Sequence, residues 1–363
     1  MIPPTATLSL CLGKSFLINF LILMFLLTGV FFVFEIVETL RRAGQLGVPL
    51  NIVVSMSGLR MAEIFQIVMP FGILFGAIYT CWKLNKTSEL VVMRSAGISV
   101  WQFLSPILAS ALLLGIISTT VINPVAAIFV KKYEKMNRIY FNQDANPVTV
   151  SRTGIWLRQP SNEGYALIHA ESLDQTQWEM TKVTVLFFDP VDNFLRRIDS
   201  PVAYLKEGYW EILQATINDR SGSDKQYSYK IPTQLTAGKI VESLSNPDTI
   251  SFWDIPSYVN VMEQTGFPAT RLKMHFQSLL AQPFLFAAMI LLAATFSLRP
   301  TRFGGVGTMI VLGVATGFFI FFMESMLSAF GVSQKIPAAL AAWTPAITGL
   351  LFGGTALLHM EDG

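Results

Sequence analysis

One short stretch joins charged side chains to an apolar face that is too short to cross a membrane. It runs from Leu84 to Ser99 and reads LNKTSELVVMRSAGIS. Thr87 or Ser88 is a candidate N-cap, and Gly97 suits the left-handed position that follows a helix. Glu89 falls in the first turn, where a carboxylate interacts favourably with the helix dipole. The stretch therefore predicts a helix of about three turns with a surface to pack against.

The residues alone leave two interpretations of this helix open. Its apolar residues, Leu90 to Met93, are too many for a solvated loop between two spans. The helix either lies in the lipid headgroup region or fits against a separate protein subunit.

A second candidate site is the adjacent pair Arg41 and Arg42. Two guanidinium groups at the edge of a span bind phosphates or carboxylates of a lipid headgroup in a bidentate manner. Generic anchoring to anionic lipid explains the pair equally well.

Two carboxylates, Glu35 and Glu324, lie at the ends of apolar runs, where a charge is costly unless it is paired or faces water. One interpretation pairs them with a basic group such as Arg41 or Lys335. The other places them at a polar opening between the first and fifth spans.

Catalytic and nucleotide-binding motifs are missing from the sequence. There is no Gly-x-Ser-x-Gly and no His-Glu-x-x-His, and the three histidines lack metal-ligand spacing. Gly13-Lys14-Ser15 has no leading glycine for a phosphate-binding loop, because Leu8 stands in that position. A net charge of +2 without basic and aromatic clusters also argues against a nucleic-acid partner. If the protein uses ATP, another chain must bind it with its Mg²⁺, so we expect no cofactor in this chain.

The composition predicts an integral membrane protein, since 52% of the 363 residues are hydrophobic and only 14% are charged. We expect an α-helical bundle of six transmembrane helices with an inserted all-β domain. The expected spans are Phe16–Phe34, Met61–Trp82, Val100–Ile122, His275–Leu298, Val306–Leu327 and Pro337–Leu358, with a loop over Glu35–Arg60. The expected domains are residues 1–122, 123–271 and 272–363. Recurrent glycine pairs four residues apart, such as Gly349 and Gly353, predict close packing between spans or with a second subunit.

In the inserted domain the hydrophobic period changes to that of strands. We expect strands over Val183–Phe188, Asn193–Ile198, Pro201–Leu205 and Tyr209–Ile217. Turns are predicted at residues 189–192, at Lys206-Glu207-Gly208 and near Gly222. Strands without helices indicate an antiparallel sandwich or a jelly roll.

The positive-inside rule orients the chain. Lys14, a cluster of Lys83, Lys86 and Arg94, and the pair Arg299 and Arg302 are assigned to the cytoplasmic side, which puts the β domain in the periplasm. We therefore expect a multi-pass protein of the bacterial inner membrane.

Three segments of the chain resemble a known family. They are Leu40–Gln45 (LRRAGQ), Ser88–Gly97 (SELVVMRSAG) and a closing Ile-Pro…Trp-Thr-Pro pattern over Ile336–Pro345. The chain resembles the LptF/LptG permease family of the lipopolysaccharide export transporter, and within it the LptG branch. The resemblance implies a jelly-roll periplasmic domain, a homologous permease partner LptF, a dimer of the ATPase LptB, and contact with LptC through the β domain.

The resemblance also implies roles for individual residues. The stretch around Glu89 corresponds to a coupling helix that fits a groove on the ATPase, with Glu89, Leu90, Met93 and Arg94 as docking residues. Lipopolysaccharide, drawn from the membrane through a lateral gate between the first and fifth spans, would contact Arg41, Arg42, Glu35, Phe31, Phe318, Phe319, Phe322 and Glu324. The family has a third basic residue about where this chain has Glu35, which leaves the charge of the substrate headgroup open.

Two other functions remain as alternatives. The first is a permease that transmits ATP hydrolysis to the periplasm without carrying lipid. The second is a stand-alone enzyme that modifies lipids. For the aromatic runs, such as Phe318–Phe319, the alternative to an acyl-chain wall is that they simply face lipid or neighbouring helices.

Overall fold

The computed structural model describes residues 6–141, 155–161, 164–174, 178–189, 191, 193–206, 208–219, 222–233, 246–264, 269–298 and 306–362. The chain divides into two compact units. The helical unit comprises Met1–Phe141, Asp248–Trp253 and Thr270–Gly363, and the β unit comprises Asn142–Pro247 and Asp254–Ala269. Arg299 and Arg302, two of the residues that the positive-inside rule assigns to the cytoplasmic side, lie outside the described residues.

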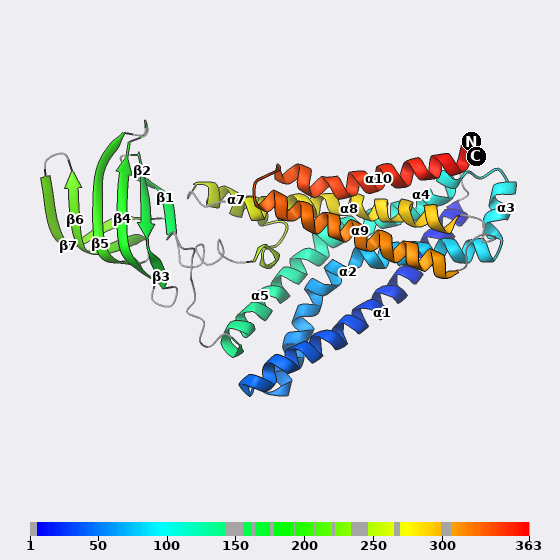
Figure 1. Cartoon of the computed structure of the whole chain (residues 1–363), viewed down its shortest axis with the longest axis horizontal. Coiled ribbons are helices and arrows are strands. Elements are labelled where there is room, and N and C mark those ends of the chain that lie inside the picture. Colours follow the sequence, from blue (N-terminus) through cyan, green and yellow to red (C-terminus); the bar gives the residue numbers. More distant parts are fainter. Residues whose placement is uncertain are drawn as a thin grey trace. The chain divides into compact units, whose positions relative to one another are not determined.

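The helical unit consists of helices, most of them long and apolar (Figure 1). They are α1 (Ala6–Leu46), α2 (Leu50–Lys86), α3 (Glu89–Ser95), α4 (Val100–Ile117), α5 (Asn123–Tyr140), α8 (Thr270–Ser297), α9 (Val306–Val332) and α10 (Ala338–Asp362), with a π-helical segment η1 (Ser118–Ile122) between α4 and α5. Among the described residues, six helical segments are long and apolar enough to cross a membrane. The prediction of six spans is therefore confirmed.

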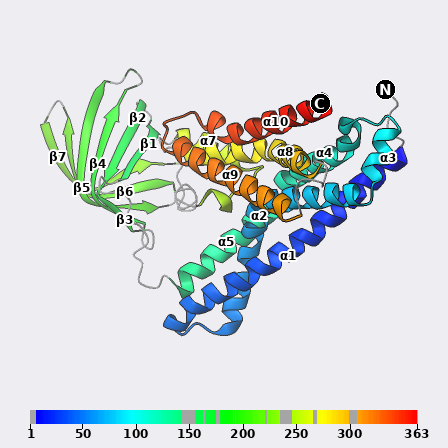
Figure 2. The same cartoon turned by 45° about the vertical axis from the view of Figure 1, so that its right-hand side comes forward.

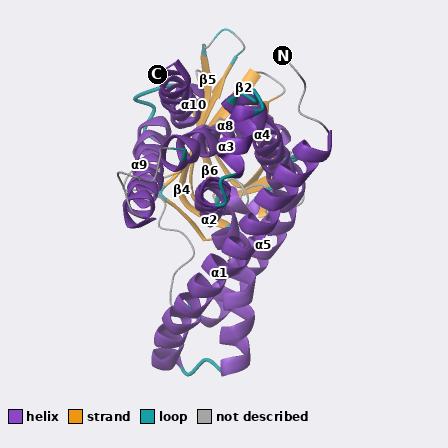
Figure 3. Cartoon of the chain, turned by 90° about the vertical axis from the view of Figure 1, so that its right-hand side faces the viewer, coloured by secondary structure: helices purple, strands orange, loops and turns teal. Residues whose placement is uncertain are grey.

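The first three spans are longer than predicted. The expected loop over Glu35–Arg60 is wrong, because α1 continues to Leu46 and α2 begins at Leu50. The predicted start of the β domain at residue 123 also falls inside a helix, since α5 continues η1 as far as Tyr140. Charged residues on these helical extensions lowered the hydropathy without ending the helices. Figures 1 and 3 show α1 and α2 extending together away from α8, α9 and α10 at the end where α1 joins α2.

Helix α8 lies in the core of the helical unit, with 72% of its most apolar window buried. The corresponding share is 17% for both α1 and α9, so these two helices present apolar faces that the chain itself does not cover. The predicted close packing at glycines between spans is confirmed at Gly353. A Cβ there would lie only 2.6 Å from Leu291 Cβ on α8.

The β unit contains one antiparallel sheet in the described part of the chain (Figure 2). Its strands are β1 (Ile155–Ser161), β2 (Gly164–Ala170), β3 (Ser172–Asp174), β4 (Glu179–Phe188), β5 (Phe194–Lys206), β6 (Tyr209–Asp219) and β7 (Gly222–Pro232). They pair in the order β1-β2-β4-β5-β6-β7, and β3 pairs with β4. After β7 the chain forms a 3₁₀ turn, η2 (Pro247–Thr249), and then a short helix, α7 (Ile255–Gln264).

Alternating burial along the strands gives the sheet one apolar face, which includes Val183, Val185 and Phe187 of β4. The expected all-antiparallel β domain is confirmed. The two strands predicted over Asn193–Ile198 and Pro201–Leu205 are one continuous strand, β5, because its pairing with β4 continues beyond Pro201 at Val202. The predicted hairpin at Gly208 is confirmed, with φ of +83° at that glycine, and Glu207 of the predicted turn lies outside the described residues.

The turn between β4 and β5 is organised by one carboxylate. Asp189 accepts hydrogen bonds from the backbone N–H groups of Val191 and Asn193, at 2.9 Å and 2.8 Å, and from Asn193 Nδ2 at 2.9 Å. The Asn193 side-chain bond, together with these backbone bonds, lowers the pKa of Asp189. Pro190 and Asp192 of the predicted turn lie outside the described residues.

Candidate functional site

Helix α3 is fixed to the helical unit through its two buried residues. Leu90 and Met93 are only 5% and 8% exposed, and they belong to the same apolar core as residues of α2 and α4. The segment after α3 turns at Gly97, whose φ is +80°, and α4 then starts with a capping box formed by Ser99 and Gln102. The backbone of α3 and the start of α4 are therefore held in place.

The exposed side of α3 differs from the predicted docking surface. Glu89 and Arg94 are exposed as expected. Leu90 and Met93 are buried in the protein's own core, so they do not form part of the exposed surface that was predicted for docking. The apolar pair that does face outward is Val91 and Val92, at 62% and 65% exposure. Hydropathy alone could not separate the two pairs.

The helix is also shorter than the predicted three turns, with seven residues from Glu89 to Ser95. Ser88 occupies the N-cap position in a left-handed conformation with φ of 61°, and its side chain makes no cap hydrogen bond. Thr87 instead lies with its hydroxyl 2.8 Å from Glu89 Oε1, so it holds the carboxylate on the exposed side.

The basic pair lies near the end of α1, remote from α3 in the same unit (Figure 1). Arg41 makes a two-pronged ion pair with Glu38, with Nε and Nη2 at 3.0 Å and 2.9 Å from the two carboxylate oxygens. Arg42 lies 3.8 Å from the same carboxylate and stacks over Phe141, with Cζ 5.5 Å from the ring centre. Glu38 therefore shares its charge between both arginines, a partner that sequence reasoning missed.

Glu35 pairs with a residue of α2 and not with Arg41. Its Oε1 accepts hydrogen bonds from Arg60 Nη1 at 3.1 Å and from the Thr39 hydroxyl at 3.1 Å. Arg60 also lies over the ring of Tyr133 on α5, with Cζ 5.6 Å from the ring centre. The side chain of Glu35 is 8% exposed, so this ion pair connects α1, α2 and α5 in a mostly buried place. The interpretation that Glu35 pairs with a basic group is confirmed, but the group is Arg60 and not Arg41, which is satisfied by Glu38.

The predicted aromatic residues face away from the rest of the chain. Phe318, Phe319 and Phe322 of α9 are 64%, 61% and 57% exposed, and Phe31 of α1 is 43% exposed. They lie on the two helices that are least buried, so they form apolar surface available to lipid or to another subunit. Their role as contacts for an acyl chain stays a prediction.

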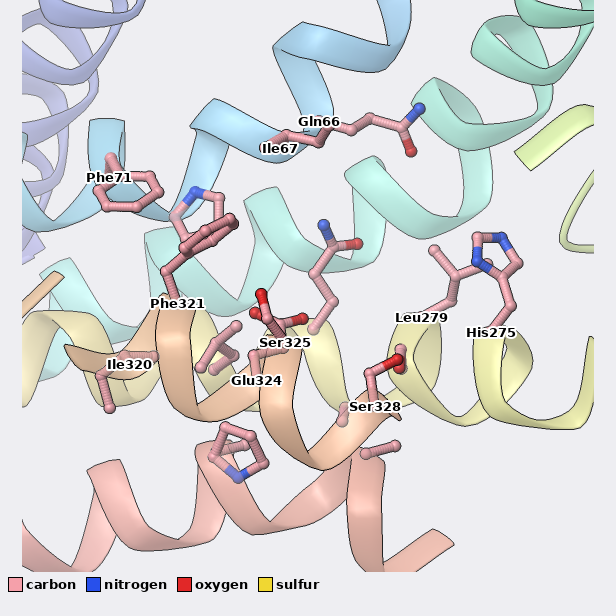
Figure 4. A pocket seen from close by; sticks show the side chains of 18 of the residues that line it. Gln66, Ile67, Phe71, His275, Leu279, Ile320, Phe321, Glu324, Ser325 and Ser328 are labelled. Carbon is pink, nitrogen blue, oxygen red and sulfur yellow. The ribbon is translucent and has the colours of Figure 1, made fainter. Parts of the chain in front are cut away.

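A cavity of about 320 Å³ lies inside the helical unit, between α2, α5, α8, α9 and α10 (Figure 4). Of the predicted site residues only Glu324 lines it. Lys335 is not its partner, since the Lys335 ammonium lies over the Phe330 ring at 5.7 Å. Phe71, Ile320 and Phe321 provide apolar wall, and Ser325 and Ser328 provide hydroxyl groups beside Glu324.

Sequence reasoning missed three other charged or titratable residues of this cavity: Glu63 of α2, Asp248 of η2 and His275 of α8. His275 Nδ1 lies 3.5 Å from Asp248 Oδ1. These residues come from segments far apart in the chain, so no spacing pattern could reveal them. Among the described residues, no group of three or more His, Cys, Asp or Glu side chains is arranged to hold a metal ion.

The described residues contain six apolar helical segments, interrupted in the sequence by an antiparallel β unit, and these features define a multi-pass membrane protein. The family model for lipopolysaccharide export system permease LptF/LptG matches residues 11–359. The chain therefore belongs to the LptF/LptG family, which consists of permeases of an export system.

Curated relatives belong to both branches of the family. The chain is 23% identical to the lipopolysaccharide export system permease protein LptG of Escherichia coli K12, over 96% of this chain and 97% of the relative. It is also 23% identical to LptG of Haemophilus influenzae, over 94% and 95%. The E. coli K12 LptF protein is 25% identical, over 44% of this chain and 42% of the relative. The likeness to LptG extends over almost the whole chain.

Proposed function

We propose that this chain is the LptG-type permease subunit of a transporter that extracts lipopolysaccharide from the inner membrane and passes it to a periplasmic bridge. A separate ATPase subunit, an LptB dimer, binds ATP and Mg²⁺ and drives the transport. The proposal rests on the family and on one structural observation, the seating of α3.

The packing of α3 supports a role in transmitting force. Its exposed residues Glu89, Val91 and Val92 are available to a partner, while Leu90 is locked in the core between α2 and α4. A movement of the ATPase that displaces Glu89 would therefore move two membrane spans together. Lys83, Lys86 and Arg94 near α3 are exposed, which supports assigning this end of the helical unit to the cytoplasm.

The uncovered faces of α1 and α9 support pairing with a second permease of the LptF type. Each helix has only 17% of its most apolar window buried. A partner that covers the aromatic residues of α9 would enclose a cavity between two chains, with α1 and α9 as the walls of a lateral gate. Arg41 and Arg42, at the other end of α1 from α3, would then meet the phosphate groups of the lipid headgroup.

The β unit offers an edge for continuing the path through LptC. Strand β7 is at the end of the described strand order, and most of its residues are exposed. An edge strand of this kind pairs with a strand of another chain through backbone hydrogen bonds. Periplasmic placement of the β unit is part of this proposal.

The test is charge reversal at the exposed carboxylate of α3. Glu89→Lys is expected to abolish copurification of the ATPase while leaving expression and thermal unfolding unchanged, because Glu89 is exposed and outside the core. The matched control Glu171→Lys reverses a carboxylate that is 60% exposed in the β unit, and it should retain the ATPase. Normal recovery of the ATPase with Glu89→Lys would contradict docking at α3.

A further inference from the structure

The cavity of the helical unit contains an acidic residue whose charge the chain does not balance. Glu324 lies within the apolar helix α9 and makes no ion pair or hydrogen bond with any other described residue. Glu324 is only partly exposed, and a carboxylate among apolar helices is costly unless a cation or a hydrogen-bond donor accompanies it. The other two carboxylates of the cavity have partners: Asp248 lies 3.5 Å from the imidazole of His275, and Glu63 interacts electrostatically with Arg60.

The surroundings of Glu324 are shaped for a small organic molecule. Ser325 and Ser328 lie on the same helix beside it and line the same cavity, and their hydroxyl oxygens add two acceptors (Figure 4). The apolar wall of Phe71, Ile320 and Phe321 adjoins them. A volume of about 320 Å³ is that of a small-molecule site and is too small for a whole lipid.

The cavity also contains an unsatisfied nitrogen. His275 Nε2 is buried and has no hydrogen-bond partner among the described residues. Buried polar atoms are normally paired, so this atom and Glu324 together indicate a polar guest in the cavity. A metal ion is a poor candidate, because the described acidic and histidine residues do not converge as metal ligands.

We propose that this cavity binds a small primary amine. Its ammonium group donates hydrogen bonds to Glu324 and to the hydroxyl oxygens of Ser325 and Ser328, and its compact apolar body contacts Phe71 and Phe321. Of the exposed aromatic residues of α9, this site uses Phe321, which is 42% exposed, whereas the export proposal uses Phe318, Phe319 and Phe322. The inference does not depend on that proposal.

Binding is measured by isothermal titration calorimetry on the full-length chain in lipid nanodiscs, with empty nanodiscs subtracted. The probe is cyclohexylmethylamine, and its matched controls are cyclohexylmethanol and cyclohexanecarboxylate. Only the amine is expected to bind. Equal binding of the alcohol would show that the cavity selects only for an apolar body and not for a cation. Absence of amine binding would indicate that Glu324 is neutralised by a proton alone. Either result overturns the proposal.

Variants locate the binding site. Glu324→Gln keeps the size of the side chain and should weaken amine binding by at least about tenfold, since an ammonium ion pair is lost in a poorly solvated place. The control Glu171→Gln removes an exposed carboxylate in the β unit and should leave binding unchanged. Ser328→Leu fills the cavity with Glu324 intact and should also abolish binding, which provides a second test if Glu324→Gln does not fold. Unchanged affinity in Glu324→Gln or in Ser328→Leu would overturn the site.

Discussion

Glu35 of α1 and Arg60 of α2 form an ion pair in which Arg60 Nη1 lies 3.1 Å from Glu35 Oε1. The pair explains how both helices extend beyond the apolar runs that first marked them as spans. Each charge would be costly alone in this mostly buried place, and together they connect α1 to α2 while Arg60 stacks on Tyr133 of α5. The resemblance places a basic residue at about the position of Glu35. In this chain the position has a carboxylate, which pairs with Arg60 inside the helical unit.

Removing one partner of this pair should destabilise the helical unit. Arg60→Gln leaves Glu35 buried without its cation, and we expect a loss of about 2–4 kcal/mol in the free energy of unfolding, seen as a lower thermal midpoint. The double variant Glu35→Arg with Arg60→Glu should recover most of the loss, because it restores the pair in the reverse sense. Arg41→Gln is the control, since Arg41 is exposed and should barely change the midpoint. Equal midpoints for Arg60→Gln and Arg41→Gln would show that the buried pair has no special role.

The turn between β4 and β5 should open in acid. Hydrogen bonds from Asn193 and Val191 hold the pKa of Asp189 below its ordinary value of about 3.9. A lowered pKa in the folded state means that the carboxylate stabilises the turn above about pH 4, and that this contribution is lost as the pH falls through the lowered pKa. Hydrogen exchange at the Val191 and Asn193 amides, corrected for intrinsic rates, should therefore accelerate on acidification below that value.

A variant that cannot titrate gives the control for this turn. Asp189→Asn removes the charge at every pH, so exchange at the two amides should already be faster at neutral pH and should lose its acid dependence. Acid-dependent exchange of the same size in Asp189→Asn would assign the effect to another group.

The sequence predicted the spans well and the polar sites poorly, for physical reasons. Runs such as those of α8 and α9 are continuous and apolar, so composition alone identifies them. Which side of α3 is buried depends on packing against α2 and α4, and hydropathy could not distinguish Leu90 from Val91. Asp248 and His275 both belong to the helical unit, but a segment of the β unit, Asp254–Ala269, lies between them in the chain. The residues of the acidic cavity therefore form no local pattern in the sequence.

The exposed aromatic surface of α9 and the basic pair of α1 provide the most direct test of lipid transport. A photoreactive amino acid at Phe319, whose native side chain is 61% exposed, should form an adduct with lipopolysaccharide in cells when the ATPase is active. Arg41→Glu with Arg42→Glu should reduce that adduct severalfold, because phosphate groups lose two cations and meet two added carboxylates, while assembly with the ATPase persists. The double variant Lys131→Glu with Lys132→Glu, which makes the same charge change on exposed residues of α5, serves as the control. An unchanged adduct in the arginine variant would leave only generic lipid anchoring for Arg41 and Arg42. Absence of any adduct in an assembled wild-type complex would favour a permease that transmits force without carrying lipid.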